Sequence, residues 1–248
     1  MQEYEHWKSL VDLQEYPALP DSELLDDFAD SPSVTSSEIT DRDTFENTGY
    51  QGDTNDNFSP VGSRPDWIIE TGSASVNDDG EYLELPSDRN HITHSDTEFE
   101  FGVPDSGTLH IKVDLQAPTS TGTGRWGFGY LAQQTSSTSE GAGSTYDESY
   151  AIWLNDHDDQ GGQLRKITSS SGVENLLSGR YDSGTDEFTV KIEIDADTSP
   201  PTHSVTANGN SWGSVQDGDF TDEGAFVIWN DLEAESQYSD IQVWIEDE

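Results

Sequence analysis

The stretch Glu187–Gly209 reads EFTVKIEIDADTSPPTHSVTANG and decides the fold of this 248-residue chain. In its first half, apolar residues alternate with polar ones over a full strand length, at Phe188, Val190, Ile192 and Ile194. This period of two is typical of an antiparallel strand with one buried and one solvated face. We therefore predict a strand at 186–195 and a second at 202–207, which ends at the Asn-Gly turn signal of 208–209.

The same pattern continues outward on both sides of this stretch. Alternating runs bounded by Gly, Asp, Asn and Pro predict further strands at 67–71, 81–85, 97–103, 108–116, 125–134, 149–155, 163–168, 225–230 and 240–246. No helical pattern longer than the N-terminal segment is visible, and no internal repeat is found. Many short strands separated by turns predict an all-β chain, folded as an antiparallel β-sandwich or jelly roll.

Three segments resemble the concanavalin A-like, or laminin-G-like, jelly-roll superfamily. They are LLDDFAD at 24–30 followed by a Trp-led strand, the paired strands of 187–209, and the ending QYSDIQVWIEDE at 237–248. The resemblance covers about 23–248 and supports a concanavalin A-like jelly roll. In such modules the first and last strands pair, so the resemblance implies that Leu24–Phe28 adjoins Asp240–Ile245.

The charge of the chain is one-sided. It has 51 Asp plus Glu against 10 Lys plus Arg, a formal net charge of -41. Such a surface repels itself in dilute buffer, but at molar salt the screening length falls to ~3 Å. The composition resembles that of proteins from halophilic archaea and their viruses, and we expect the protein to work in brine.

Several classes of partner are disfavoured by composition. The chain has no cysteine, which excludes disulfides, and no apolar run near the ~20 residues that span a bilayer. No Lys/Arg patch exists to meet phosphates, so we expect no nucleic acid and no membrane insertion. The start, MQEYEHWKSLVDLQEYP, has neither a basic leader nor a continuous apolar stretch, so a secretion signal is not expected.

The N-terminal segment is predicted to be a docking arm. Residues 1–22 form this short helical or extended arm, and 23–248 form the sandwich, with a long irregular excursion at about 29–66. Apolar residues fall at helix-like spacing in the arm, at Tyr4, Trp7, Leu10 and Val11. A helix this short needs a surface to pack on, either its own sandwich or another subunit of a homo-oligomer.

Three acidic residues in the deciding stretch raise the question of catalysis. The superfamily includes glycoside hydrolases with carboxylates on one face of a strand, and Glu193, Asp195 and Asp197 have that spacing. Those hydrolases, however, have Glu where this chain has Asp197. The acids also continue the solvent face of Thr189 and Lys191. We therefore expect no enzyme activity from them, with glycoside hydrolysis as the alternative.

Calcium is the one candidate cofactor, because hard cations favour clustered carboxylate oxygens, and no other cofactor is expected. The turn at 155–161 supplies three acids, and Asp26 or Asp27 would meet Asp240 if the first and last strands adjoin. The competing interpretation is a solvated acidic surface. The candidate ligands are Asp156, Asp158, Asp159, Asp27 and Asp240.

Sugar binding needs an exposed aromatic ring beside hydrogen-bonding groups. The candidate rings are Trp153, Trp212, which lies in the loop NGNSWGS, and Trp229. The alternative is that these rings fill the core of a chain poor in Leu and Ile.

Together these features predict a virion surface protein of a halophilic archaeal virus, such as a capsid turret, decoration or tail-fibre subunit. It would be assembled in the host cytoplasm with other virion proteins and would bind a host-surface glycan or glycoprotein. The alternative is a carbohydrate-binding module of a haloarchaeal surface protein or glycoside hydrolase.

Overall fold

The computed structural model describes residues 39–44, 51–53, 57–58, 67–76, 83–87, 91–95, 100–118, 124–133, 148–155, 160–168, 172–182, 187–231 and 233–246. All of them belong to the unit Ser37–Glu248. Within these ranges every regular element is a β-strand. No helix in the described ranges is long and apolar enough to cross a membrane. The predicted arm, 1–22, lies outside them.

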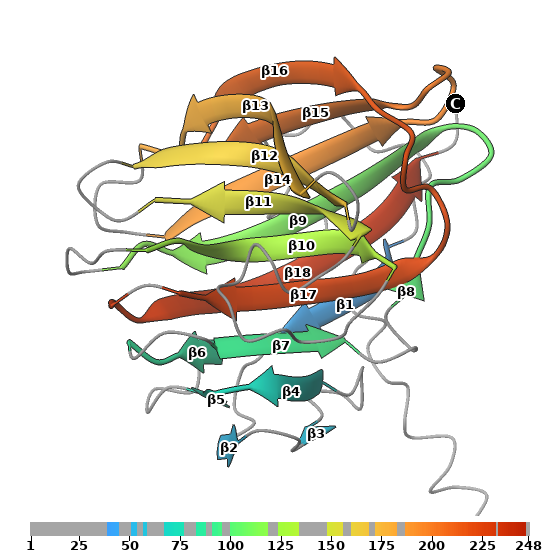
Figure 1. Cartoon of the computed structure of the whole chain (residues 1–248). Coiled ribbons are helices and arrows are strands. Elements are labelled where there is room, and N and C mark those ends of the chain that lie inside the picture. The colour runs from blue at the N-terminus through green and yellow to red at the C-terminus, as the bar shows by residue number, and fades with distance from the viewer. Residues whose placement is uncertain are drawn as a thin grey trace, which may run out of the picture. The chain divides into compact units, whose positions relative to one another are not determined.

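The described strands form two antiparallel sheets that lie one over the other (Figure 1). Sheet A contains, in spatial order, β16 (Asn210–Gln216), β15 (Thr202–Ala207), β14 (Glu187–Asp195), β9 (Thr108–Gln116), β18 (Ser236–Glu246), β6 (Leu83–Leu85), β5 (Ser73–Val76) and β2 (Gln51–Asp53). A further strand, β1 (Ile39–Thr44), pairs with β18.

Sheet B faces sheet A across the core. It contains, in spatial order, β13 (Gly172–Arg180), β12 (Gly161–Thr168), β11 (Glu148–Leu154), β10 (Trp126–Ala132), β17 (Gly224–Asn230), β7 (His91–Ser95), β4 (Trp67–Thr71) and β3 (Asn57–Phe58), and β8 (Glu100–Phe101) pairs with β17. This arrangement confirms the predicted all-β antiparallel sandwich.

Strand β14 shows why the sequence folds in this way. Phe188, Val190, Ile192 and Ile194 are all buried, while the residues between them face the outside of sheet A. Burying each such side chain stabilises the fold by ~1.5–3 kcal/mol. Since the polar residues of β14 must then point outward, the alternation also presents Glu193 on the outer face.

Aromatic rings make up much of the core between the sheets. Trp126 lies edge-on to Phe188 and to Tyr238, and Phe128 stacks on Phe226. These large rings compensate for the low share of aliphatic residues in the chain.

The structure differs from the expectations at the sheet edges and near the N-terminus. Strand β18 pairs with β9, β6 and β1. Leu24–Phe28 lies outside the described residues, so its implied pairing with Asp240–Ile245 stays a prediction. The range 29–66, expected to be irregular, contains β1, β2 and β3. Edge strands β13 and β16 were not predicted, because the residues of both are mostly exposed and so carry little periodicity.

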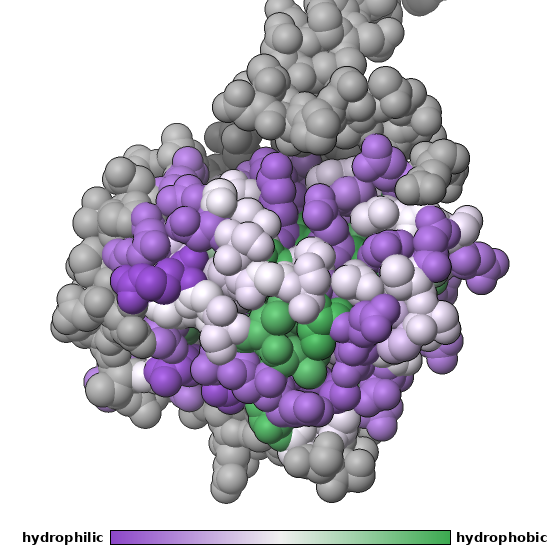
Figure 2. All heavy atoms as spheres, turned by 90° about the horizontal axis from the view of Figure 1, so that it is seen from above, coloured by the Kyte–Doolittle hydropathy of each residue, from purple (hydrophilic) through white to green (hydrophobic). Residues whose placement is uncertain are grey.

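The edge formed by β13 and β16 carries apolar side chains. Seen from above, the surface is mostly polar, with apolar residues gathered in a central patch (Figure 2). The apolar side chains that β13 and β16 leave partly or fully exposed are Val173, Leu176, Leu177 and Val215.

Candidate functional site

The outer face of sheet A carries two rows of polar and aromatic side chains. The strand registers align Trp244, His110, Glu193 and Ser204 in one row across β18, β9, β14 and β15. The second row, two residues along each strand, contains Glu246, Thr108, Asp195 and Thr202. Because side chains two residues apart share a face, both rows point away from the core.

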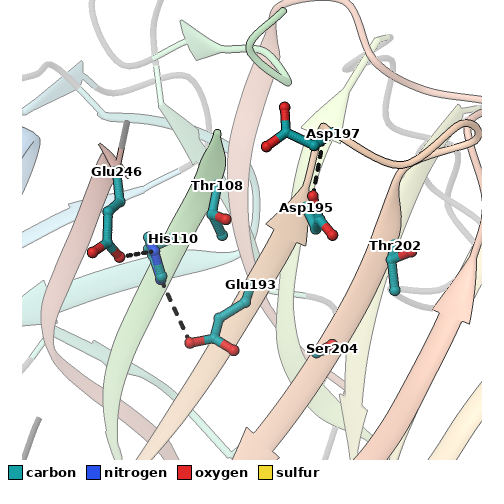
Figure 3. A pocket seen from close by; sticks show the side chains of 8 residues that line it. All are labelled: Thr108, His110, Glu193, Asp195, Asp197, Thr202, Ser204 and Glu246. Atoms are coloured by element: carbon teal, nitrogen blue, oxygen red, sulfur yellow. Dashed lines mark hydrogen bonds and ion pairs between the residues drawn. The ribbon is translucent and has the colours of Figure 1, made fainter. Parts of the chain in front are cut away.

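These rows line a pocket of about 380 Å³ (Figure 3). Its volume falls within the range of ~300–1,000 Å³ that is usual for small-molecule sites. Every residue that lines it is polar or charged: Thr108, His110, Glu193, Asp195, Asp197, Thr202, Ser204 and Glu246.

His110 is held at one side of the pocket by three neighbours. Its Nε2 donates a hydrogen bond to Glu246 Oε2 at 3.1 Å, and its Nδ1 lies 3.7 Å from Glu193 Oε1. Its ring stacks on the indole of Trp244, with ring centroids 4.9 Å apart and planes within 7°. The imidazole is therefore fixed between two carboxylates, as Figure 3 shows.

Two of the acids also shape the turn after β14. Asp195 Oδ1 accepts a hydrogen bond from the backbone N–H of Asp197 at 2.9 Å. Asp197 Oδ1 in turn accepts one from the N–H of Gly107 at 3.2 Å. These hydrogen bonds occupy one oxygen of the Asp195 carboxylate and one of the Asp197 carboxylate. The Glu193 carboxylate accepts no such backbone hydrogen bond from the turn, and its side chain is 58% exposed.

The lining determines which ligands suit the pocket. Carboxylates accept hydrogen bonds, and the hydroxyls of Thr108, Thr202 and Ser204 both donate and accept them. The arrangement suits a ligand that presents several hydroxyl groups rather than an apolar one. Sequence analysis placed Glu193, Asp195 and Asp197 on one face, but it missed His110 and Glu246, which the register of β9 and β18 brings beside them.

On the outer face of sheet B, Trp153 lies beside Arg165. The guanidinium carbon of Arg165 is 3.7 Å from the centre of the Trp153 ring. Trp153 also contacts Trp229 edge-on, with centroids 5.7 Å apart. Gly127, which pairs with both tryptophans, has no room for a Cβ against the carbonyl of Ile152.

A second polar network surrounds Asp217, and its contacts stabilise the fold. Tyr150 Oη donates to Asp217 Oδ1 at 2.5 Å, and Lys166 Nζ lies 2.5 Å from Asp217 Oδ2. Burial alone raises the pKa of Asp217, but hydrogen bonds from Lys166 and Tyr150 outweigh it and hold the pKa below its ordinary value.

His203 adjoins this network in the core. Its Nε2–H donates to the carbonyl of Asp217 at 3.1 Å, which leaves Nδ1 to accept from Tyr130 Oη at 3.3 Å. Burial lowers the pKa of His203 to about 4, so the ring is neutral at pH 7.

The three tryptophans predicted to bind sugar lie in different settings. Trp212 is 7% exposed and packs in the core, where its Nε1 donates to the carbonyl of Arg180 at 3.1 Å. Trp229 is 1% exposed. Trp153 is half-buried, on the outer face of sheet B.

Of the predicted calcium ligands, the structure describes Asp240 alone. Its Oδ2 accepts a hydrogen bond from Gln242. Asp27, Asp156, Asp158 and Asp159 lie outside the described residues, as do the predicted arm residues Tyr4, Trp7, Leu10 and Val11. Among the described residues no group of three or more His, Asp or Glu is arranged to hold a metal ion. Calcium binding stays a prediction.

Comparison with solved structures confirms the fold as an antiparallel β-sandwich jelly roll, which a glucanase and carbohydrate-recognition domains also have. An endo-1,3-beta-glucanase from Streptomyces sioyaensis superposes with a TM-score of 0.57 at 16% identity, covering 88% of this chain and 99% of that one.

Two carbohydrate-recognition domains give similar superpositions. The potassium-bound domain of Emp46p has a TM-score of 0.52 at 11% identity, covering 73% of this chain and 89% of that one. The domain of Emp47p has a TM-score of 0.51 at 13% identity, with 81% and 96% covered. No protein-family model matches the chain, and no curated protein matches its sequence.

Proposed function

We propose that this chain binds saccharides and that the pocket on the outer face of sheet A is the binding site. The observation that carries the proposal is the lining of the pocket, in which carboxylates and hydroxyls converge from four strands and one turn. A saccharide presents many hydroxyl donors at close spacing, and each can bond to a carboxylate or a threonine or serine hydroxyl there. The shared fold with carbohydrate-recognition domains adds support.

Glu193 and His110 are the side chains that we expect to matter most. Glu193 lies in the centre of the row and offers a carboxylate oxygen to the pocket, while His110 forms its wall beside Trp244. Hydrogen bonds to a charged group contribute ~1.5–3 kcal/mol, so loss of the Glu193 charge should weaken binding about tenfold or more.

The first ligand to test is a neutral β-1,3-linked glucose trisaccharide, because one structural neighbour is an endo-1,3-beta-glucanase. Isothermal titration of the full chain in about 2 M KCl should give saturable binding with one site, since the net charge is screened there. Glu193→Gln should weaken it at least tenfold. The matched control is Glu187→Gln, which removes a carboxylate from the same face of β14 outside the pocket and should leave binding unchanged.

The same titration separates binding from hydrolysis. A binding module leaves the trisaccharide intact, whereas a glycoside hydrolase releases new reducing ends over time. Equal affinities of the intact chain and Glu193→Gln would argue against the pocket as the site.

The setting that we propose for this activity is a surface exposed to brine, such as that of a haloarchaeal virion. The support is the net charge of -41, together with a fold suited to adhesion. Many copies would turn weak saccharide contacts into firm attachment. Light scattering in about 2–3 M KCl tests it: the full chain should form a defined oligomer that dissociates when residues 1–22 are removed, and a monomer in both cases would contradict it.

A further inference from the structure

Among the residues that the structure describes, two of the few basic side chains have no acidic partner. Lys112, Lys166 and Arg180 each form an ion pair with a nearby carboxylate. Arg165 and Arg125 form none among the residues that the structure describes. With 51 Asp and Glu in the chain, this absence is unexpected on electrostatic grounds, because carboxylates are available almost everywhere else.

The two arginines lie on either side of Trp153 in the register of sheet B. Arg125 directly precedes β10 and Arg165 lies on β12, with Trp153 of β11 between these strands. Burial lowers the pKa of Arg165, and the positive charge of Arg125 lowers it further. A negatively charged ligand bound at Arg165 would offset this repulsion.

Neutral side chains fix the position of the Arg165 guanidinium without neutralising its charge. Its Nε donates to Gln163 Oε1 at 2.8 Å and its Nη2 donates to the same oxygen, so a neutral amide fixes the plane of the guanidinium. The group also stacks on Trp153. Its Nη1 has no hydrogen bond among the described residues, and the Nη1 of Arg125 bonds only to the adjacent carbonyl of Gly124 at 2.6 Å.

A third donor at this place also lacks an acceptor. The Nε1–H of Trp153 is buried and has no hydrogen-bond partner in the described part of the chain. Leaving such a donor unpaired costs ~1–3 kcal/mol, so unsatisfied groups of this kind call for an explanation. Among the described residues these N–H donors form no ion pair or hydrogen bond with a carboxylate, which fits an oxygen-rich anion as ligand.

We propose that the outer face of sheet B binds the anionic group of an acidic saccharide, a carboxylate or a sulfate ester, between Arg165 and Arg125 and beside Trp153. The saccharide part of this ligand rests on the proposed function, but the site is separate from the pocket on sheet A. Planar guanidinium groups bind such groups through paired hydrogen bonds, and the exposed part of the Trp153 ring offers a surface for a sugar ring.

The test compares three trisaccharides with one backbone. The probes are the neutral β-1,3-linked glucose trisaccharide, its form oxidised to carboxylates at C6, and its 6-sulfate ester, titrated into the full chain in about 2 M KCl. At least one charged form should bind ten or more times tighter than the neutral form, and the two charged arms show whether carboxylate or sulfate is preferred.

Three variants locate the effect. Arg165→Gln should remove the gain shown by the charged form and leave the neutral trisaccharide unaffected. Trp153→Phe keeps an aromatic ring without the N–H and should remove part of the gain. The control is Arg180→Gln, which deletes the same charge from an exposed residue of β13 paired with Asp182 and should change neither affinity.

The outcomes distinguish this site from the pocket. If the neutral trisaccharide binds and the charged forms bind no tighter, the anionic site is wrong and the proposed function stands. If the charged form binds through Arg165 while the neutral form does not bind, the anionic site is supported and the pocket is wrong. If Arg165→Gln and Arg180→Gln weaken binding of the charged trisaccharide equally, the effect is one of net charge and the proposal is overturned. Failure of all three saccharides to bind would also overturn it.

Discussion

The indole of Trp212 lies directly against the backbone of Gly179, where a Cβ on the glycine would overlap the ring. Trp212 belongs to β16 of sheet A, and Gly179 belongs to β13 of sheet B, so this contact joins the edge strands of the two sheets. Gly162 of β12 leaves room for the far side of the same ring. The ring therefore closes one edge of the sandwich, and the two glycines make the space for it.

Gly179→Ala should destabilise the fold, because the added methyl group meets a ring that has no space to move into. Overpacking of this kind costs ~1–3 kcal/mol. Chemical denaturation in about 2 M KCl measures the loss. The control, Ser178→Ala, alters the neighbouring residue at an exposed hydrogen bond with Asn175 and should change stability by less than ~0.5 kcal/mol. Equal stability of Gly179→Ala and the unchanged chain would show that the ring is not confined there.

Asp217→Asn should destabilise the fold more than Asp219→Asn. Both carboxylates contact Lys166, at 2.5 Å and 2.9 Å, but the side chain of Asp217 is 10% exposed and that of Asp219 is 59% exposed. The amide that replaces the Asp217 carboxylate keeps one acceptor oxygen but removes the buried negative charge that Lys166 faces, which costs ~3 kcal/mol or more. The exposed pair contributes ~0–1 kcal/mol. Urea unfolding of both variants at pH 7 measures the difference, and equal losses would contradict this account.

His203 should make stability depend on pH in the acid range. Its pKa is lowered from 6.5 to about 4 in the folded chain, so between these values the unfolded chain binds more protons. The stabilisation is fully present above about pH 6.5 and is lost as pH falls toward 4. The loss reaches ~3 kcal/mol, since each pKa unit corresponds to ~1.4 kcal/mol.

The measurement is the free energy of unfolding at pH 4.5 and pH 7.5, in about 2 M KCl, for the intact chain and for His203→Gln. The difference between the two proteins isolates the histidine from the 51 acids, whose titration both share. The intact chain should lose more stability than the variant on acidification. Parallel pH profiles would contradict the buried neutral imidazole.

How far the sequence predicts this molecule depends on which residues carry a pattern. The alternation of β14 predicted its own burial, the sandwich, and the outward face of Glu193 and Asp195. The contact of His110 with both Glu193 and Glu246 could not be predicted, because it depends on pairing between strands more than 50 residues apart, and local periodicity says nothing about register.

The tryptophans illustrate the same limit. Trp212 lies in a Gly- and Ser-rich stretch that the sequence analysis interpreted as a loop. In the structure this stretch is strand β16, and the Trp212 ring is buried against glycines of the other sheet. The stacking of Arg165 on Trp153 likewise follows from the register of β11 and β12. The sequence pointed to Arg165 only through composition, since arginine is rare in this chain.

The central claim, saccharide binding in the sheet A pocket, is tested most directly by hydrogen exchange of single backbone amides. The N–H groups of Gly107 and Asp197 donate to carboxylates of the pocket, so they report on its occupancy. Exchange is measured in about 2 M KCl with and without saturating neutral β-1,3-linked trisaccharide. The account predicts slower exchange at these two amides and little change on β11 and β12. Unchanged exchange at both amides, with or without protection elsewhere, would contradict it.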